Sequence, residues 1–192
     1  MAKRAGRDTL TGGTGDVNPQ YLQGAVSMVA GAANTPVEVA VGLPILRPGM
    51  GASQQKAQVV ELLKAWCYLP PPVAGTDVNV GTAQFLSTLS MSTAAQGTTV
   101  PNLSNPRVQA QFRQSITASF TAAGTQYSAP VGVQCWDFTD GAGHGILIGT
   151  DNMYMQYDND GFTSVLTATW KIAYRFKEVP LIEYIGMVQS QQ

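Results

Sequence analysis

The sequence has few charged residues, one histidine and two cysteines. Charged residues make up 12% of the 192 positions, and the formal net charge is −1. This share is about half of that in typical soluble proteins, so copies of the chain repel one another weakly and dense self-association is permitted. A single histidine cannot provide the cluster of histidines and carboxylates that a metal-dependent hydrolase needs. The composition therefore argues against that enzyme class and is compatible with a protein that assembles.

Long apolar runs are also absent. No run approaches the roughly 20 residues of a membrane helix, and the basic start is followed by polar residues rather than by the apolar segment of a signal peptide. We therefore expect no membrane insertion. Cys67 and Cys135 each lie in an apolar run and lack a CxxC spacing, which predicts two buried thiols. The sequence leaves open whether the two cysteines pair in a disulfide.

Helical periodicity is scarce, and stretches in which apolar and polar residues alternate take its place. In LTATWKIAYRFK (residues 166–177), Trp170 and Tyr174 lie on the apolar face while Lys171 and Arg175 lie on the other. This alternation predicts a strand with one face in the core and the other face wet or at an interface.

The segment QQKAQVVELLKAWCYLPPP (residues 54–72) is ambiguous, because several of its apolar residues also fit a helical stripe. Its aromatic residues and the three prolines that end it abruptly favour a strand. We therefore assign it as a strand in which Val60, Leu62, Trp66 and Tyr68 share one face.

Nine strands are expected along the chain, at residues 23–30, 36–42, 57–69, 84–92, 111–121, 130–138, 145–149, 153–158 and 164–177. Without clear crossover helices, these strands predict an all-β protein, an antiparallel jelly-roll sandwich of eight to nine strands. The seventh and eighth strands are expected to form a hairpin with a turn at Thr150–Asn152, followed by a second turn at Asp158–Gly161. The sandwich spans residues 21–192, and the polar, glycine-rich residues 1–20 form a mobile N-terminal arm.

Two stretches resemble functional motifs, one a nucleotide-binding loop and the other a cysteine–histidine catalytic pair. Each lacks part of the arrangement that its motif requires. TGGTGD (residues 11–16) has neither the lysine of a phosphate-binding loop nor the flanking strand and helix of a dinucleotide loop. CWDFTDGAGHG (residues 135–145) gathers Cys135, Asp137, Asp140 and His144, but proximity in sequence does not bring a nucleophile and its base together. A buried thiol followed by a polar loop with an exposed histidine is favoured.

DNDG (residues 158–161) resembles part of a calcium-binding loop, in which Asp158 and Asp160 would be ligands. Thr167 stands where such a loop has its closing glutamate, so a tight turn is favoured and a calcium site at an interface stays open. We expect no catalytic site, no enzyme activity and no cofactor.

Four segments carry a resemblance to a known family: RDTLTGGTGDVNPQ (7–20), ILIGTDNMYMQ (146–156), WKIAYRFK (170–177) and EYIGMVQSQQ (183–192). From arm to tail, the chain resembles the capsid proteins of small circular single-stranded DNA viruses that encode a replication initiator, the CRESS-DNA viruses. The resemblance implies one jelly-roll domain that assembles into an icosahedral shell, of 60 copies, around circular DNA. It also implies location in the virion and a receptor on the host surface.

The basic residues of the arm are fewer than this family leads one to expect. Many of its capsid proteins carry a long arginine-rich arm, whereas this chain has only Lys3, Arg4 and Arg7 there. We therefore expect weak binding of single-stranded DNA through these residues, or binding through interior residues such as Arg107 and Arg113, or neutralisation by cations.

A second hypothesis is a carbohydrate-binding or adhesin-like β-sandwich. In such a module an exposed tryptophan beside Asp or Asn residues would bind the sugar, and the candidates are Trp66, Trp136 and Trp170. All three lie in strand patterns, which favours core packing for each of them.

Overall fold

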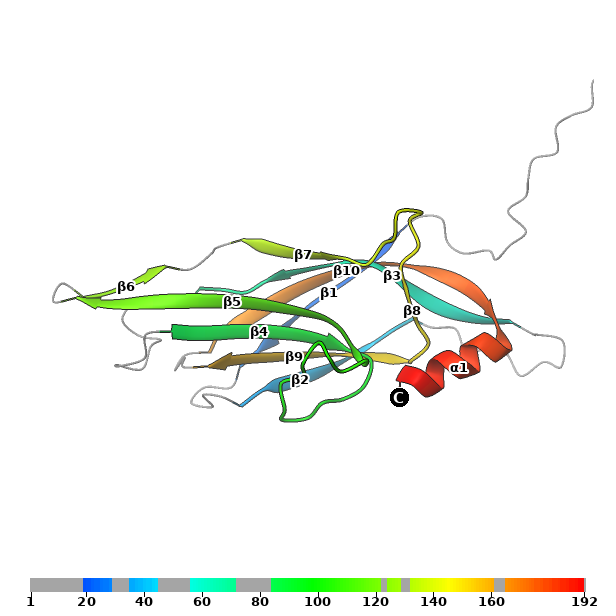
Figure 1. Cartoon of the computed structure of the whole chain (residues 1–192), viewed down its shortest axis with the longest axis horizontal. Coiled ribbons are helices and arrows are strands. Elements are labelled where there is room, and N and C mark those ends of the chain that lie inside the picture. The colour runs from blue at the N-terminus through cyan, green and yellow to red at the C-terminus, as the bar shows by residue number, and fades with distance from the viewer. Residues whose placement is uncertain are drawn as a thin grey trace, which may run out of the picture.

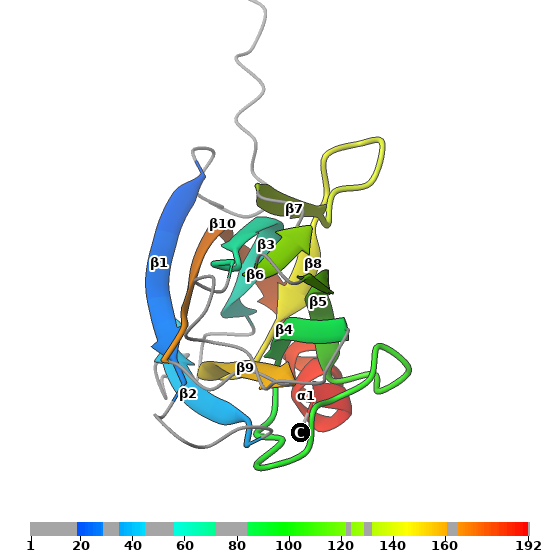
Figure 2. The ribbon, with the colours of Figure 1, turned by 90° about the vertical axis from the view of Figure 1, so that its left-hand side faces the viewer.

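The strands of the chain form two five-stranded antiparallel sheets that face each other (Figures 1 and 2). This computed structural model describes residues 19–28, 35–44, 56–71, 84–121, 124–128, 132–160 and 165–191. Within these ranges it has ten strands and one C-terminal helix. Residues 1–18, which include Lys3, Arg4 and Arg7, lie outside the described residues.

Sheet A is built around β10 and β3, with β1 on one edge and β7 and β8 on the other. Its strands are β1 (Gln20–Ser27), β10 (Thr167–Pro180), β3 (Lys56–Tyr68), β7 (Val133–Asp137) and β8 (Ile146–Ile148). Both β7 and β8 pair with β3, one after the other along the same edge. They therefore act as one strand that is interrupted by the loop between them.

Sheet B has the order β2, β9, β4, β5, β6. These strands are β2 (Val37–Gly42), β9 (Asn152–Asp160), β4 (Gln84–Ser92), β5 (Val108–Thr121) and β6 (Gly124–Ser128). If β7 and β8 count as one strand and β6 counts as an extension of β5, the chain has eight strands. In this numbering, sheet A has the order 1-8-3-6 and faces sheet B, which has the order 2-7-4-5. This is the strand order of a jelly roll. The predicted all-β jelly-roll sandwich is confirmed, although β6 was not predicted as a strand.

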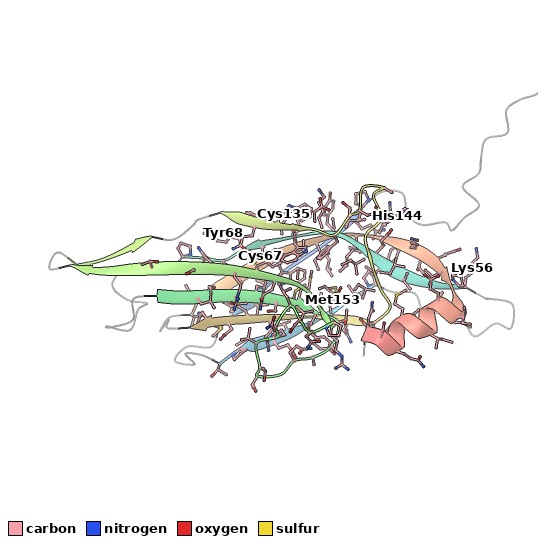
Figure 3. The ribbon with its side chains drawn as sticks, viewed as in Figure 1. Lys56, Cys67, Tyr68, Cys135, His144 and Met153 are labelled. Carbon is pink, nitrogen blue, oxygen red and sulfur yellow. The ribbon has the colours of Figure 1, made fainter. Side chains whose placement is uncertain are left out.

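The core fills the space between the two sheets with residues from nearly every strand. Its largest fully buried side chains include Leu62, Ile172, Met155 and Tyr157, together with Met153, which Figure 3 labels. Burial of one such side chain contributes about 1.5–3 kcal/mol. The Tyr157 hydroxyl accepts a hydrogen bond from the Ser87 hydroxyl at 3.1 Å, so this phenol is satisfied inside the core.

Strand β10 has the alternation predicted for it. Trp170 and Tyr174 are buried with Ala168 and Ile172, while Lys171 lies on the opposite, outer face. Since alternate residues share a face, Lys171, Arg175 and Val179 mark the outer face of sheet A from one end of β10 to the other.

Strand β3 does not have the alternation predicted for it. Tyr174 pairs with Leu62 and Ala173 pairs with Lys64, so Leu63 is an extra residue that forms a β-bulge. An extra residue inverts the alternation beyond it. Leu62 therefore points into the core, whereas Trp66 points to the outer face, and the prediction that they share one face is wrong.

The predicted hairpin after residue 145 is also wrong. β8 pairs with β3 in sheet A, whereas β9 pairs with β2 and β4 in sheet B, so the segment between them crosses from one sheet to the other. Asp158 and Asp160 are part of β9, opposite Thr88 and Leu86, rather than part of a tight turn. Alternating residues look the same in sequence whether two strands pair with each other or lie in opposite sheets.

A C-terminal helix, α1 (Leu181–Gln191), was not predicted. Its residues Tyr184 and Met187 pack against a small cluster formed by Ala57, Val59 and Val179 at the end of β3 and β10. The helix covers these apolar side chains, which continue the outer face of sheet A.

The last residue of α1 fixes the helix to sheet A. The Gln191 side-chain amide donates to the Leu147 carbonyl at 2.7 Å and accepts from the Gly149 N–H at 2.9 Å, so it pairs with β8 as a short strand would. The Thr93 hydroxyl also donates to the Gln191 carbonyl, at 3.1 Å.

Replacing Gln191 by alanine is expected to lower the unfolding free energy by about 1–2 kcal/mol, because two backbone groups at β8 lose their partner. Urea unfolding measures this loss, and hydrogen exchange of the α1 amides should speed up in the same variant. Gln189→Ala is the matched control, since Gln189 is exposed on the same helix. Equal losses in both variants would contradict this role for Gln191.

Candidate functional site

Three features follow one another along the outer face of sheet A. Helix α1 covers the end of β3 near Val59, a buried ion cluster surrounds Glu61, and an open aromatic groove lies beside Trp66. All three lie on residues of β3 and β10 that share this face. The bulge at Leu63 is what brings Trp66 to the same face as Glu61.

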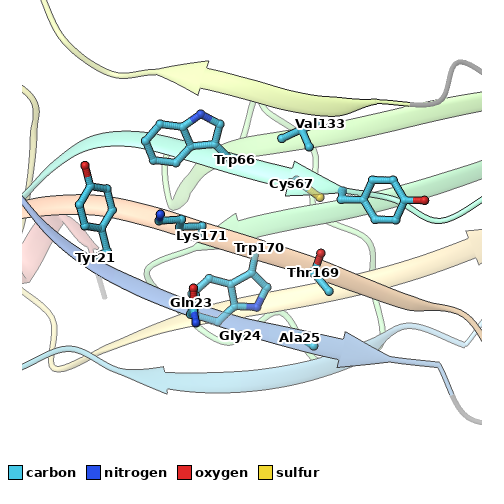
Figure 4. A pocket seen from close by; sticks show the side chains of 11 residues that line it. Tyr21, Gln23, Gly24, Ala25, Trp66, Cys67, Val133, Thr169, Trp170 and Lys171 are labelled. Carbon is cyan, nitrogen blue, oxygen red and sulfur yellow. The ribbon is translucent and has the colours of Figure 1, made fainter.

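The aromatic groove crosses β1, β10, β3 and β7 and has a volume of about 790 Å³ (Figure 4). The rings of Tyr21 and Trp66 lie 6.4 Å apart across it at 41°. The Lys171 ammonium lies 4.3 Å from the centre of the Tyr21 ring, a cation–π contact worth roughly 0.5–1 kcal/mol at an exposed site. Tyr21 and Val133 leave large apolar surfaces exposed at its rim. The groove thus offers aromatic faces and one cation to a ligand or partner.

The groove has no carboxylate among its lining residues. Other cations on the outer face are paired: Lys64 with Asp137 at 2.8 Å, and Arg175 with Glu61. Within the described residues, Lys171 has no ion pair with a carboxylate. An anionic group entering the groove would therefore meet a lysine that no carboxylate of the described residues neutralises.

The ion cluster is built around Glu61, whose side chain is 1% exposed. Arg175 Nε donates to it at 2.5 Å, Lys177 Nζ lies 3.8 Å away, and the Gly145 N–H donates at 3.0 Å. Arg175 also donates to the Gly143 carbonyl at 3.1 Å. Glu61 and Arg175 together hold the loop between β7 and β8 against the outer face.

The pKa of Glu61 reflects opposing effects. Burial would raise it, but the hydrogen bonds from Arg175 and from the Gly145 N–H, with the charges of Arg175 and Lys177, bring the pKa below its ordinary value of 4.5. The cluster therefore favours the ionised carboxylate in the folded protein.

The stability contributed by this ionisation is expected to depend on pH. Since the folded pKa is lowered, the contribution is fully present above about pH 4.5 and is lost as the pH falls through the folded value. Urea unfolding at several pH values between 3 and 7 should give a steeper fall for the wild type than for Glu61→Gln. Parallel curves would contradict this assignment.

The two cysteines lie on opposite faces of sheet A. Cys67 is buried and Cys135, which pairs in register with Trp66 on β3, is exposed; both are free thiols (Figure 3). The prediction of two buried thiols is therefore wrong for Cys135, and the disulfide that the sequence left open is not formed. Burial raises the pKa of the Cys67 thiol to about 12.

A thiol reagent at pH 8 should therefore modify one cysteine per folded chain and two per unfolded chain, because the thiolate is the reactive form. Ellman's reagent with and without urea measures this count. The Cys135→Ser variant should lose the fast reaction, and fast modification of two thiols in the folded wild type would contradict the placement.

The loop between β7 and β8 carries the histidine. His144 Nδ1 lies 3.2 Å from the Asp140 carboxylate, and both side chains are exposed. Asp140 Oδ1 also accepts the N–H groups of Ala142 and His144, which lowers its pKa. In the described part of the chain, His144 pairs with Asp140 rather than with Cys135, as expected for a polar loop with an exposed histidine.

The proposed nucleic-acid residues are not brought together in the described part of the chain. Arg107 lies just before β5 and Arg113 lies on β5 in sheet B, and neither residue lines the groove. A basic contribution from Lys3, Arg4, Arg7, Arg107 and Arg113 stays a prediction. Sequence reasoning missed Lys171 as a site residue, although its place on the wet face of an alternating strand was the available signal.

A calcium site at Asp158 and Asp160 also stays a prediction. These residues lie on β9, and the described residues contain no group of three or more His, Cys, Asp or Glu side chains suited to a metal ion. Among the same residues, no helix is long and apolar enough to cross a membrane.

The three tryptophans have different surroundings. Trp170 is buried and Trp136 packs edge-on against Phe112, with ring centres 6.4 Å apart. Trp66 lines the open groove, so the expectation of core packing is wrong for this residue. Its exposure could not be predicted because it depends on the bulge at Leu63.

The solved structures that we compared in detail share little sequence identity with this chain. No protein-family model and no curated protein matches the chain. VP1 of human polyomavirus 12, solved with 3′-sialyllactosamine, matches at 9% identity and a TM-score of 0.47, over 84% of this chain and 100% of that chain. The unassembled VP1 pentamer of Merkel cell polyomavirus matches at 9% identity and 0.42, over 83% and 95%. Identities and TM-scores this low do not establish a shared fold or function. The jelly-roll assignment therefore rests on the strand order alone.

Proposed function

We propose that the chain is a viral capsid protein whose copies assemble into a closed icosahedral shell. The observation that carries the proposal is the strand order, because the resemblance to CRESS-DNA virus capsid proteins implies a single jelly roll and the strands pair in that order. A fold alone does not define a function. The resemblance of the four sequence segments and the surface of the domain supply the remaining support.

The surface supports assembly through its exposed apolar side chains. Large ones occur in the groove (Tyr21, Val133) and on α1 (Ile182, Ile185). Apolar groups gathered at separate places on a domain of low charge are typical of surfaces that become covered by other subunits. Packing between copies would bury them.

In the proposed particle, 60 copies enclose a circular single-stranded DNA genome within the virion, and loops on the outside contact a host receptor. The residues before β1 act as an arm that brings Lys3, Arg4 and Arg7 to the genome. The predicted arm of residues 1–20 is one residue too long, since Gln20 is the first residue of β1. Since these are few charges, the arm neutralises little of the genome in each copy, and repetition over the shell adds the contributions.

Negative-stain electron microscopy of the purified full chain tests the proposal. We expect uniform closed particles, and fields without particles over a range of salt and pH would contradict the capsid function. Deleting residues 1–7 then tests the arm, through the ratio of absorbance at 260 and 280 nm of the particles. An unchanged ratio would rule out the arm as the main DNA contact without affecting the shell.

A further inference from the structure

Helix α1 presents an apolar surface that the described residues leave exposed. Ile182 is 82% exposed, and Leu181 and Ile185 are exposed beside it, on the side of the helix away from Tyr184 and Met187. The helix is fixed at its end by Gln191, so this surface is held in place. Exposed apolar groups on a fixed helix are typical of a protein interface.

The aromatic groove is a second apolar surface that stays open among the described residues, and the helix of the same chain is too far away to fill it. The contacts of α1 are with Val59 and Val179 at one end of β3 and β10, whereas Trp66 and Thr169 border the groove toward the other end. Seven residues from Val59 to Trp66 correspond to roughly 20 Å along a strand. The ion cluster around Glu61 lies between them.

Both surfaces are apolar, and each carries one charged residue of opposite sign. Glu183 is the charged residue of α1, and Lys171, which has no ion pair within the described part, is the charged residue of the groove. A nucleic acid strand would require a cation for each phosphate it places there, and the groove supplies one. The apolar side of α1, with Glu183 beside Ile182 at its border, fits this lining better.

We infer that α1 of one copy docks in the aromatic groove of a second copy. Ile182 lies against Tyr21 and Trp66, and Ile185 and Glu183 flank it on either side of the helix, with Glu183 toward Lys171. Because the two surfaces differ, the contact is heterologous and repeats from copy to copy until a ring or shell closes. Many weak contacts of this kind stabilise a closed assembly together. The inference rests on the proposed function, since it names the contact through which the shell is built.

Charge exchange tests the pairing of Glu183 with Lys171. Sedimentation velocity should show that Lys171→Glu and Glu183→Lys each reduce the assembled fraction at least several-fold, and that the double variant restores it. The Ile182→Ser, Ile185→Ser variant should remove assembly, while Leu103→Ser, which alters an exposed apolar residue elsewhere, should not. Thermal unfolding verifies that each variant is folded, as expected for changes at exposed positions.

Disulfide trapping tests the contact directly, in a Cys135→Ser background. Val133→Cys chains mixed with Ile182→Cys chains should form disulfide-linked dimers under mild oxidation, and neither variant should do so alone. Failure to cross-link on mixing, or normal assembly of the Ile182→Ser, Ile185→Ser variant, would overturn the inference. If that variant still forms particles, the proposed capsid function stands, whereas a wild type that remains monomeric contradicts both. A different outcome is that the helix variants assemble normally and oligothymidylate quenches the part of the tryptophan fluorescence that comes from Trp66. That result would assign the groove to nucleic acid instead.

Discussion

Replacing Gly145 by alanine is expected to lower the unfolding free energy by roughly 3 kcal/mol, at the upper end of what overpacking costs. A Cβ atom at this position would lie 1.8 Å from the carbonyl oxygen of Leu62 and 2.7 Å from its carbonyl carbon. Both are backbone atoms of β3, which is paired on both edges and cannot move aside. The loop would have to shift, and the Gly145 N–H would lose its hydrogen bond to Glu61.

Gly141→Ala is the matched control for this prediction. Gly141 belongs to the same loop, and a Cβ atom there would meet no atom within 4 Å. Urea unfolding should therefore give a change of less than about 0.5 kcal/mol for Gly141→Ala. Similar losses for both glycines would show that the loop does not pack against β3 as described.

Replacing Glu61 by alanine is expected to cost about 1–3 kcal/mol, because it leaves the donors of the cluster without their acceptor, while the remaining cations, Arg175 and Lys177, are partly exposed to water. Arg175 and Lys177 would then face each other without a carboxylate, and the Gly145 N–H would be left without its acceptor. Glu61→Gln should cost less, since an amide oxygen can still accept the Gly145 hydrogen bond. Denaturant unfolding at pH 7 measures both changes.

The control for Glu61 is Glu178→Ala. Glu178 is paired with Lys56 at 3.4 Å, but Lys56 is exposed, and exposed pairs contribute about 0–1 kcal/mol. If the Glu61 and Glu178 variants lose the same small amount of stability, the cluster around Glu61 does not hold the loop.

The all-β class could be predicted from the sequence, because the alternation of apolar and polar residues is a local signal. In β10, residues from Thr167 to Ile172 alternate between exposed and buried, as the sequence pattern predicts. Strand order is not local, so the jelly roll followed from the number of strands and the absence of crossover helices. The hairpin at Thr150–Asn152 was predicted wrongly for the same reason, since the alternation of residues in a strand does not specify which strand it pairs with.

The groove could not be predicted, because it depends on one extra residue. Leu62 and Leu63 are both apolar, so the sequence does not indicate which of them leaves the alternation. Only pairing with Tyr174 and Ala173 decides this, and the decision moves Trp66 from the core to the surface. Tertiary contacts, rather than local propensity, also fix α1, in which Ile182, Ile185 and Gly186 are modest or poor helix formers.

Sedimentation velocity of the full chain over a range of concentrations tests the central claim, self-assembly of this jelly roll, most directly. We expect a large species with one fixed sedimentation coefficient, whose amount grows with concentration while its size does not, as closure of a shell requires. A single species with the mass of one chain, 20.3 kDa, at all concentrations up to the solubility limit would contradict it.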